Sequence, residues 1–128
     1  MFLLVALSVG TMLAGCRKGA EAQTDILIAH EITPQPPVVG VTATVSLKVT
    51  DKAGRNVTGA KVKIEGNMSH AGMAPVFAEA GEVAPGRYQA HIAFSMSGDW
   101  VLLVDLTLPD GRKLQRQLEV KGVRPDDG

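Results

Sequence analysis

Residues 41–50 read VTATVSLKVT, and apolar and polar side chains alternate there at every position. A period of two is typical of a β-strand with one buried face, because successive side chains of a strand point to opposite sides of the sheet. Val41, Val45 and Val49 belong to the apolar set, and β-branched residues favour strands. This stretch therefore predicts a strand that turns one face toward a hydrophobic core.

Strand-like segments recur on both sides of this stretch. They cover residues 25–32, 60–65, 76–80, 87–96, 100–108 and 113–121, and turn residues such as Gly, Pro, Asp and Asn separate them. No segment after residue 23 has the period of an amphipathic helix. We therefore predict an all-β fold, an immunoglobulin-like antiparallel β-sandwich of about seven strands, with an open barrel as the alternative.

Positions within the sandwich can be predicted for two of these segments. Prolines follow residues 25–32 closely, and proline cannot donate to a sheet ladder, so this first strand belongs at an edge. Residues 100–108 are the most apolar segment, which predicts a central strand. The chain has one cysteine, so packing around Trp100, rather than a disulfide, must hold the sheets together.

The composition limits the size of the protein and its partners. The chain has 128 residues, enough for one small domain, and 13 Lys plus Arg balance 13 Asp plus Glu. These charges are scattered, so we expect no nucleic-acid partner. No Ser–His–Asp arrangement, cysteine pair or phosphate-binding loop is recognisable, so we do not expect an enzyme. We expect a monomer.

The N-terminus has the features of an export signal. Residues 1–14, MFLLVALSVGTMLA, are apolar, too short to span a bilayer comfortably, and end in small residues. They run into LAGC at 13–16, which resembles the bacterial lipobox, where the cysteine, here Cys16, is acylated and becomes the new N-terminus. The alternative is an uncleaved anchor helix with Cys16 as an ordinary thiol.

These features divide the chain into four predicted parts. They are a lipoprotein signal peptide at 1–15, a lipidated cysteine and flexible tether at 16–23, the sandwich domain at 24–122 and a polar tail at 123–128. We expect an extracytoplasmic lipoprotein anchored to the membrane by its lipid, on the periplasmic side. If the cell has an outer membrane, that membrane is favoured, since Arg17 is not the aspartate of an inner-membrane retention signal.

Methionine and histidine cluster between two predicted strands. Residues 67–75 read NMSHAGMAP and place Met68, His70 and Met73 close together, and Gly72 lets the turn fold back. Thioether sulfur and neutral imidazole are soft to borderline ligands, which suit Cu(I) better than magnesium or calcium. Met96 ends a distant predicted strand, and strand ends meet at the two ends of a sandwich. We therefore predict a copper site formed by Met68, His70, Met73 and Met96.

Structural roles are the alternative for these side chains. Met96 has the inward parity of its segment and would then fill the core, while Met68 and Met73 would cover the end of the sandwich. His91 lies on the polar face of its segment and is interpreted as a surface histidine. His30 is interpreted in the same way, as an exposed or hydrogen-bonded side chain.

Four motifs together resemble a known family. They are GAKV at 59–62, MSHAGMAP at 68–75, PGRY at 85–88 and FSMSGDW at 94–100. They resemble the YtkA-like domain, related to FixH-type proteins, over residues 24–120. The resemblance implies a small extracytoplasmic immunoglobulin-like sandwich, often lipid-anchored, with copper-delivery or cytochrome oxidase assembly proteins as neighbours. It also implies a copper role for the Met/His loop and Met96.

Two hypotheses of function follow. In the first, the domain binds copper, as Cu(I), at one end of the sandwich and passes it to a copper protein or to a respiratory oxidase under assembly. In the second, the loop or a sheet edge docks on a membrane protein and no metal takes part.

Overall fold

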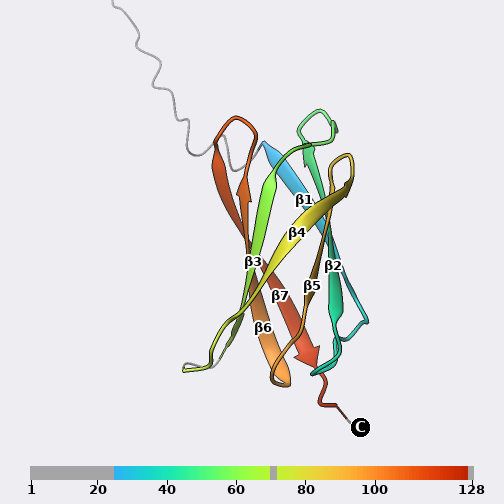
Figure 1. The fold of residues 1–128 in the computed structure, drawn as a ribbon, viewed down its shortest axis with the longest axis vertical. Coiled ribbons are helices and arrows are strands. Elements are labelled where there is room, and N and C mark those ends of the chain that lie inside the picture. Colours follow the sequence, from blue (N-terminus) through green and yellow to red (C-terminus); the bar gives the residue numbers. More distant parts are fainter. Residues whose placement is uncertain (1–24, 70–71, 127–128) are drawn as a thin grey trace, which may run out of the picture.

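The structure is a computed structural model, and it describes residues 25–69 and 72–126. Within these ranges the chain forms strands and no helix (Figure 1). In chain order the strands are β1 (Ile26–Thr33), β2 (Ala43–Asp51), β3 (Lys61–Met68), β4 (Val76–Ala84), β5 (Arg87–Ile92), β6 (Gly98–Thr107) and β7 (Lys113–Val123). Every pairing between them is antiparallel, so the predicted all-β class is confirmed.

The strands form two layers that share β4. One layer has the order β1-β2-β5-β4, and the other has the order β4-β3-β6-β7. Residues 76–80 of β4 pair with β3, and the part after Gly81 pairs with β5, so this strand crosses from one sheet to the other (Figure 1). Apart from the pairing of β3 with β4, the neighbours are those of the seven-stranded immunoglobulin sandwich, with its four-stranded and three-stranded sheets. The predicted immunoglobulin-like sandwich is therefore confirmed.

The core lies between the two layers and consists of the inward side chains of each strand. In β2 these are Ala43, Val45, Leu47 and Val49, as the alternation of residues 41–50 predicts. Trp100 is 1% exposed and its ring centroid lies 5.2 Å from that of Phe94, edge to face. Among the described residues, the buried side chains are apolar or aromatic, and those of Tyr88 and Trp100 have hydrogen-bond partners for their polar atoms. Apolar packing therefore joins the sheets, as expected for a chain without a cysteine pair.

The predicted edge position of the first strand and the predicted central position of residues 100–108 are both confirmed. β1 is the outermost strand of its layer, and β6 lies between β3 and β7. After β1 the chain crosses to the other layer, where the Arg124 N–H donates to the Pro37 carbonyl and the Val39 N–H donates to the Arg124 carbonyl, both at 2.8 Å. Val123 is 2% exposed, so the end of β7 belongs to the core rather than to the expected polar tail.

Several strand limits differ from those expected, among them the end of β3, which continues to Met68, and three limits of β4, β5 and β6. β4 continues through Gly81 to Ala84, because its second half finds a new partner in β5. β5 ends at Ile92, and β6 begins at Gly98. The chain must leave one sheet after β5 and cross to the other before β6, and packed sheets lie about 10 Å apart. Residues 93–97 make this crossing and cannot continue the ladder.

Several predictions concern parts of the chain outside the described residues. These are the signal peptide, the acylation of Cys16, the tether and the position of His70. Between residues 25 and 126, apart from 70–71, no helix is long and apolar enough to cross a membrane.

Candidate metal centre

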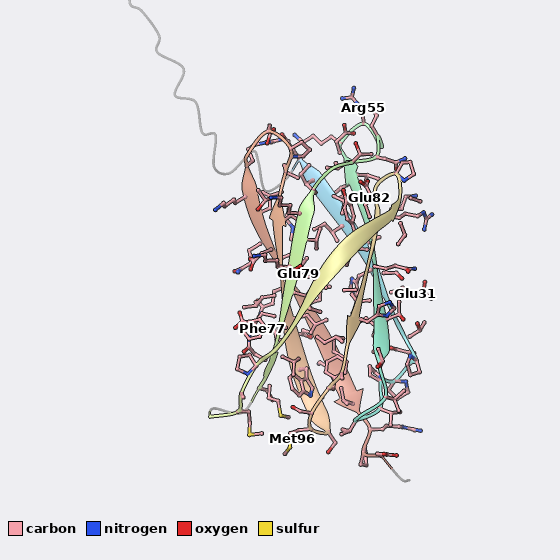
Figure 2. All side chains as sticks on the ribbon, viewed as in Figure 1. Glu31, Arg55, Phe77, Glu79, Glu82 and Met96 are labelled. Atoms are coloured by element: carbon pink, nitrogen blue, oxygen red, sulfur yellow. The ribbon has the colours of Figure 1, made fainter. Side chains whose placement is uncertain are left out.

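All methionines of the described chain lie at one end of the sandwich. Met68 ends β3, Met73 follows in the β3–β4 connection, and Met96 lies in the β5–β6 connection. Met68 is paired with Trp100 near the start of β6, which brings the two connections to the same end. Figure 2 shows their sulfur atoms, in yellow, gathered there. We call this the methionine end.

Met68 is the most enclosed of these side chains. It is partly buried and packs against the core. A Cβ placed on Gly98 would lie 3.5 Å from the terminal methyl carbon of Met68, so this methyl lies over the glycine backbone. Gly98 has φ of +119°, which side-chain-bearing residues rarely adopt. The thioether of Met68 is therefore positioned by the start of β6.

The backbone of Met96 is fixed by a hydrogen bond, and its side chain is exposed. Its carbonyl accepts a hydrogen bond of 2.9 Å from the Trp100 indole N–H. Its side chain is 46% exposed, whereas Phe94, two residues earlier, is 1% exposed. The alternative of Met96 as core filler is therefore wrong, because β5 ends before Met96 and the alternation ends with it.

Met73 lies on the connection between β3 and β4, within the predicted Met/His loop. It is 39% exposed and follows Gly72, whose φ of +89° fits the expected reversal of the chain. The loop is fixed at its base, because the Ser69 N–H donates to the Asp99 carbonyl at 3.3 Å. His70 lies outside the described residues, so its place relative to the sulfurs stays a prediction.

Asp99 fixes the methionine end through both its backbone and its side chain, a role that was not predicted. Its carbonyl holds the base of the methionine loop, and its carboxylate Oδ1 accepts from the Gly122 N–H at 3.0 Å. It thereby links the β3–β4 loop, β6 and β7 at the methionine end. The only signal in the sequence was its place between Gly98 and Trp100, where a turn was expected.

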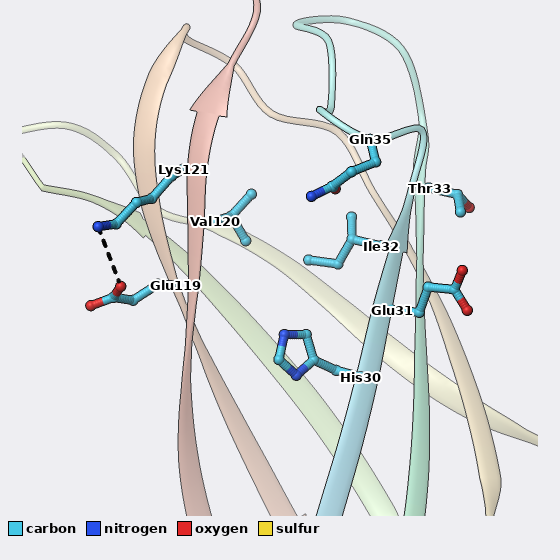
Figure 3. Close-up of a pocket in the computed structure, with 8 residues that line it drawn as sticks. All are labelled: His30, Glu31, Ile32, Thr33, Gln35, Glu119, Val120 and Lys121. Atoms are coloured by element: carbon cyan, nitrogen blue, oxygen red, sulfur yellow. Dashed lines mark ion pairs between the residues drawn. The ribbon is translucent and has the colours of Figure 1, made fainter.

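The two described histidines lie on strands and not on the connections that carry Met73 and Met96, in keeping with their expected structural roles. His91 is exposed on the outer face of β5, with its Nδ1 3.4 Å from the Thr44 hydroxyl oxygen. His30 is exposed and lines a groove of about 330 Å³ between β1 and β7 (Figure 3). Figure 3 also shows the ion pair of Glu119 and Lys121 on the far side of this groove.

The side chains at the methionine end are the kind of ligand that soft metal ions prefer. The described residues hold no group of three or more His, Cys, Asp or Glu side chains that could bind a metal. Thioethers are neutral, soft ligands that suit Cu(I), and an imidazole from His70 would complete a mixed set. The methionines therefore fit Cu(I) and not a hard cation, which prefers oxygen ligands.

The fold and this end define a class of protein, a small immunoglobulin-like sandwich with methionines on the connections at one end. The model of the YtkA-like family matches residues 21–105, a range that contains all four predicted copper ligands. The chain belongs to the YtkA-like family. Its relation to FixH-type proteins stays a prediction.

No curated protein matches the chain. A solved structure of murine CRIg is similar, with 11% sequence identity and a TM-score of 0.45, and the match covers 79% of this chain and 99% of that one.

Proposed function

We propose that this chain is an extracytoplasmic, lipid-anchored domain that binds Cu(I) through Met68, His70, Met73 and Met96. It delivers the ion to a partner protein, in copper supply or in the assembly of a respiratory oxidase. The supporting observation is the exposure of two large thioether side chains, those of Met73 and Met96, at the end where Met68 also lies. Exposed thioethers gain little from packing but are available to an incoming ion.

The unequal burial of the ligands suits transfer. Met68 is partly buried and held over Gly98, so it would keep its place throughout. Met73 and Met96 are exposed, so ligands of a partner can replace them one at a time. Because thioethers and neutral imidazole carry no charge, they need no proton release to bind or to leave, unlike a cysteine thiolate.

A Cu(I) titration of the full chain against a chelating competitor tests the proposal. Met73→Leu and Met96→Leu remove sulfur but keep similar volume, so each should weaken Cu(I) binding about tenfold or more, which corresponds to about 1.4 kcal/mol. Matched controls are His30→Ala and His91→Ala, which should leave the affinity unchanged because neither histidine belongs to the proposed ligand set. Unchanged affinity in both methionine variants and in His70→Ala would show that the site is wrong.

A metal-independent interaction module is the second candidate, and an exposed aromatic side chain favours it. Phe77 is 71% exposed on the outer face of β4 and is paired with Glu65, which is in turn paired with Leu103 of β6. Phe77→Ser should then abolish co-purification of a membrane-protein partner while Cu(I) affinity is retained. Loss of the partner on metal removal, with Phe77→Ser having no effect, would favour the copper function instead.

A further inference from the structure

At the end opposite the methionines, acidic side chains form ion pairs and hydrogen bonds. This end, where β1 begins and the β2–β3, β4–β5 and β6–β7 turns lie, is called the tether end (Figure 1). Three aspartates form ion pairs there, namely Lys52–Asp25 at 2.9 Å, Arg55–Asp51 at 3.0 Å and Arg112–Asp110 at 2.8 Å. A fourth, Asp105, accepts a hydrogen bond of 2.8 Å from the Gln115 side-chain amide. Glu82 uses both oxygens to accept from the Gly59 and Gly86 N–H groups, each at 3.1 Å.

Cations remain at the tether end without an acidic partner among the described residues. Lys48 and Arg87 lie directly opposite each other on β2 and β5. On the other layer, Lys61 and Lys113 lie on either side of Thr107 of β6. All four are exposed, and Lys48 and Arg87, as like charges directly opposite each other on a sheet, repel each other. Each layer therefore presents a pair of basic side chains that an external anion would stabilise.

The methionine end has the opposite balance. Its cations are Lys121 and Arg124, and Lys121 lies 3.8 Å from Glu119. Glu31, Glu65 and Asp99 also lie in this half of the strands. The charges are therefore scattered along the sequence but separated along the long axis of the fold, basic at the tether end and acidic at the methionine end.

The N-terminal part of the chain leads into the tether end. β1 begins there at Ile26, and the residues before it include the apolar stretch 1–14 and the basic pair Arg17 and Lys18. We propose that the tether end docks on an anionic phospholipid bilayer, with Lys48, Arg87, Lys61 and Lys113 against the lipid phosphates. This inference rests on the membrane attachment proposed above but not on copper binding.

Docking in this way fixes the orientation of the domain. β6, with 10 residues, runs from the methionine end to the tether end, and a strand rises about 3.3 Å per residue. The methionine end would therefore stand about 30 Å from the membrane surface, turned toward partners in the surrounding space. Its acidic side chains are also repelled by anionic lipid, which favours the same orientation.

Energy transfer from tryptophan to a dansyl-labelled lipid headgroup tests this orientation, because the chain has one tryptophan and Trp100 lies at the methionine end. The full chain is inserted into vesicles of phosphatidylcholine with or without phosphatidylglycerol, in the absence of metal. We expect about twofold less transfer on the anionic vesicles, and a return to the phosphatidylcholine value in 1 M salt, where the Debye length falls to about 3 Å. Equal transfer on both vesicles, or failure to partition into either, overturns the proposal.

Substitutions at the four basic residues test whether they form the surface that contacts the bilayer. Replacing Lys48, Arg87, Lys61 and Lys113 by Gln should abolish the difference between the two vesicles, while Lys121→Gln, at the methionine end, should preserve it. Circular dichroism confirms that each variant is folded. If the quadruple variant is folded and keeps the difference, the assigned surface is wrong. Since no metal is present, these outcomes are independent of the copper titration.

Discussion

Gly66 shows at the scale of one residue how closely the methionine end is packed. It lies in β3, two residues before Met68, and has no left-handed φ. A Cβ at this position would lie 2.8 Å from Val76 Cγ2 and 3.2 Å from Leu102 Cδ2. Gly66→Ala should therefore destabilise the fold by about 1–3 kcal/mol through overpacking, as measured by urea unfolding.

Gly81 is the matched control for this prediction. It also lies in a strand without a left-handed φ, but a Cβ there would meet nothing within 4 Å. Gly81→Ala should leave stability unchanged or raise it by up to about 1 kcal/mol, because alanine restricts the unfolded chain. Equal losses in the two variants would show that the crowding at Gly66 is not the cause.

Tyr88 is a buried side chain with a specific hydrogen-bonding role. Its hydroxyl donates to the Val57 carbonyl at 2.8 Å and accepts from the Ala60 N–H at 3.1 Å, which fixes the β2–β3 connection. Tyr88→Phe removes both bonds and should cost about 1–3 kcal/mol at neutral pH, measured by urea unfolding.

The same side chain predicts a dependence on alkaline pH. Burial, together with the nearby Glu82 carboxylate, raises the pKa of Tyr88 above its usual value of 10.0, although the Ala60 N–H opposes this. The neutral phenol is thus favoured in the folded state, so its contribution is complete below pH 10 and is lost as the pH rises through the higher folded pKa. Wild type should lose stability there, and Tyr88→Phe should lack that part of the loss.

At the scale of elements, two turns depend on an aspartate. Asp51 Oδ1 accepts from the backbone N–H groups of Ala53 and Arg55, and Asp110 Oδ1 accepts from that of Arg112. These backbone hydrogen bonds, helped by the arginine charges, lower the pKa of both carboxyl groups below 3.8. Their contribution to stability is therefore present above the ordinary pKa and is lost as the pH falls through the folded value.

NMR chemical shifts of the carboxyl carbons, followed as the pH is lowered, test this prediction. Asp51 and Asp110 should titrate below 3.8 in the folded protein, and Arg112→Ala should raise the pKa of Asp110 while leaving that of Asp51 unchanged. A titration of either group at or above its ordinary value would contradict the proposed role of the turn.

The strands themselves were largely predictable, and the exceptions have a common cause. Alternation in residues 41–50 identified the buried face of β2 because the side-chain period of two is a local property. The ends of β4 and β5 depend instead on where the chain changes sheet. Gly81 stays in a strand because β5 receives it, and Met96 leaves its strand because β6 belongs to the other layer. The residues next to Gly81 and Met96 in the sequence do not show which strand lies beside them in the fold.

For the molecule as a whole, the sequence predicted that the methionines meet at one end of the sandwich but not how each is held. Strand ends of a sandwich meet at two ends, so Met68, Met73 and Met96 were expected together. The support of Met68 by Gly98 and the anchoring role of Asp99 depend on pairing between β3, β6 and β7, which distant segments create. The separation of charge along the long axis is invisible in a balanced composition for the same reason.

Metal binding at the methionine end should be coupled to global stability. A ligand that binds only the folded state stabilises it by RT ln(1 + [L]/Kd), about 2.7 kcal/mol when free Cu(I) is a hundred times Kd. Met73→Leu and Met96→Leu alter exposed side chains, so without metal each should shift stability by no more than about 0.5 kcal/mol.

With Cu(I) held at a fixed free concentration by a chelator, both variants should lose about half or more of the stabilisation that the wild type gains, because a tenfold weaker Kd lowers it from about 2.7 to about 1.4 kcal/mol. Thermal unfolding with and without the buffered metal measures both quantities on the same protein. Met68→Leu separates the structural from the ligand role, because Met68 is also packed against the core and should lower stability even without metal. An equal Cu(I)-dependent rise in melting temperature in all three variants and the wild type would mean that the ion binds elsewhere.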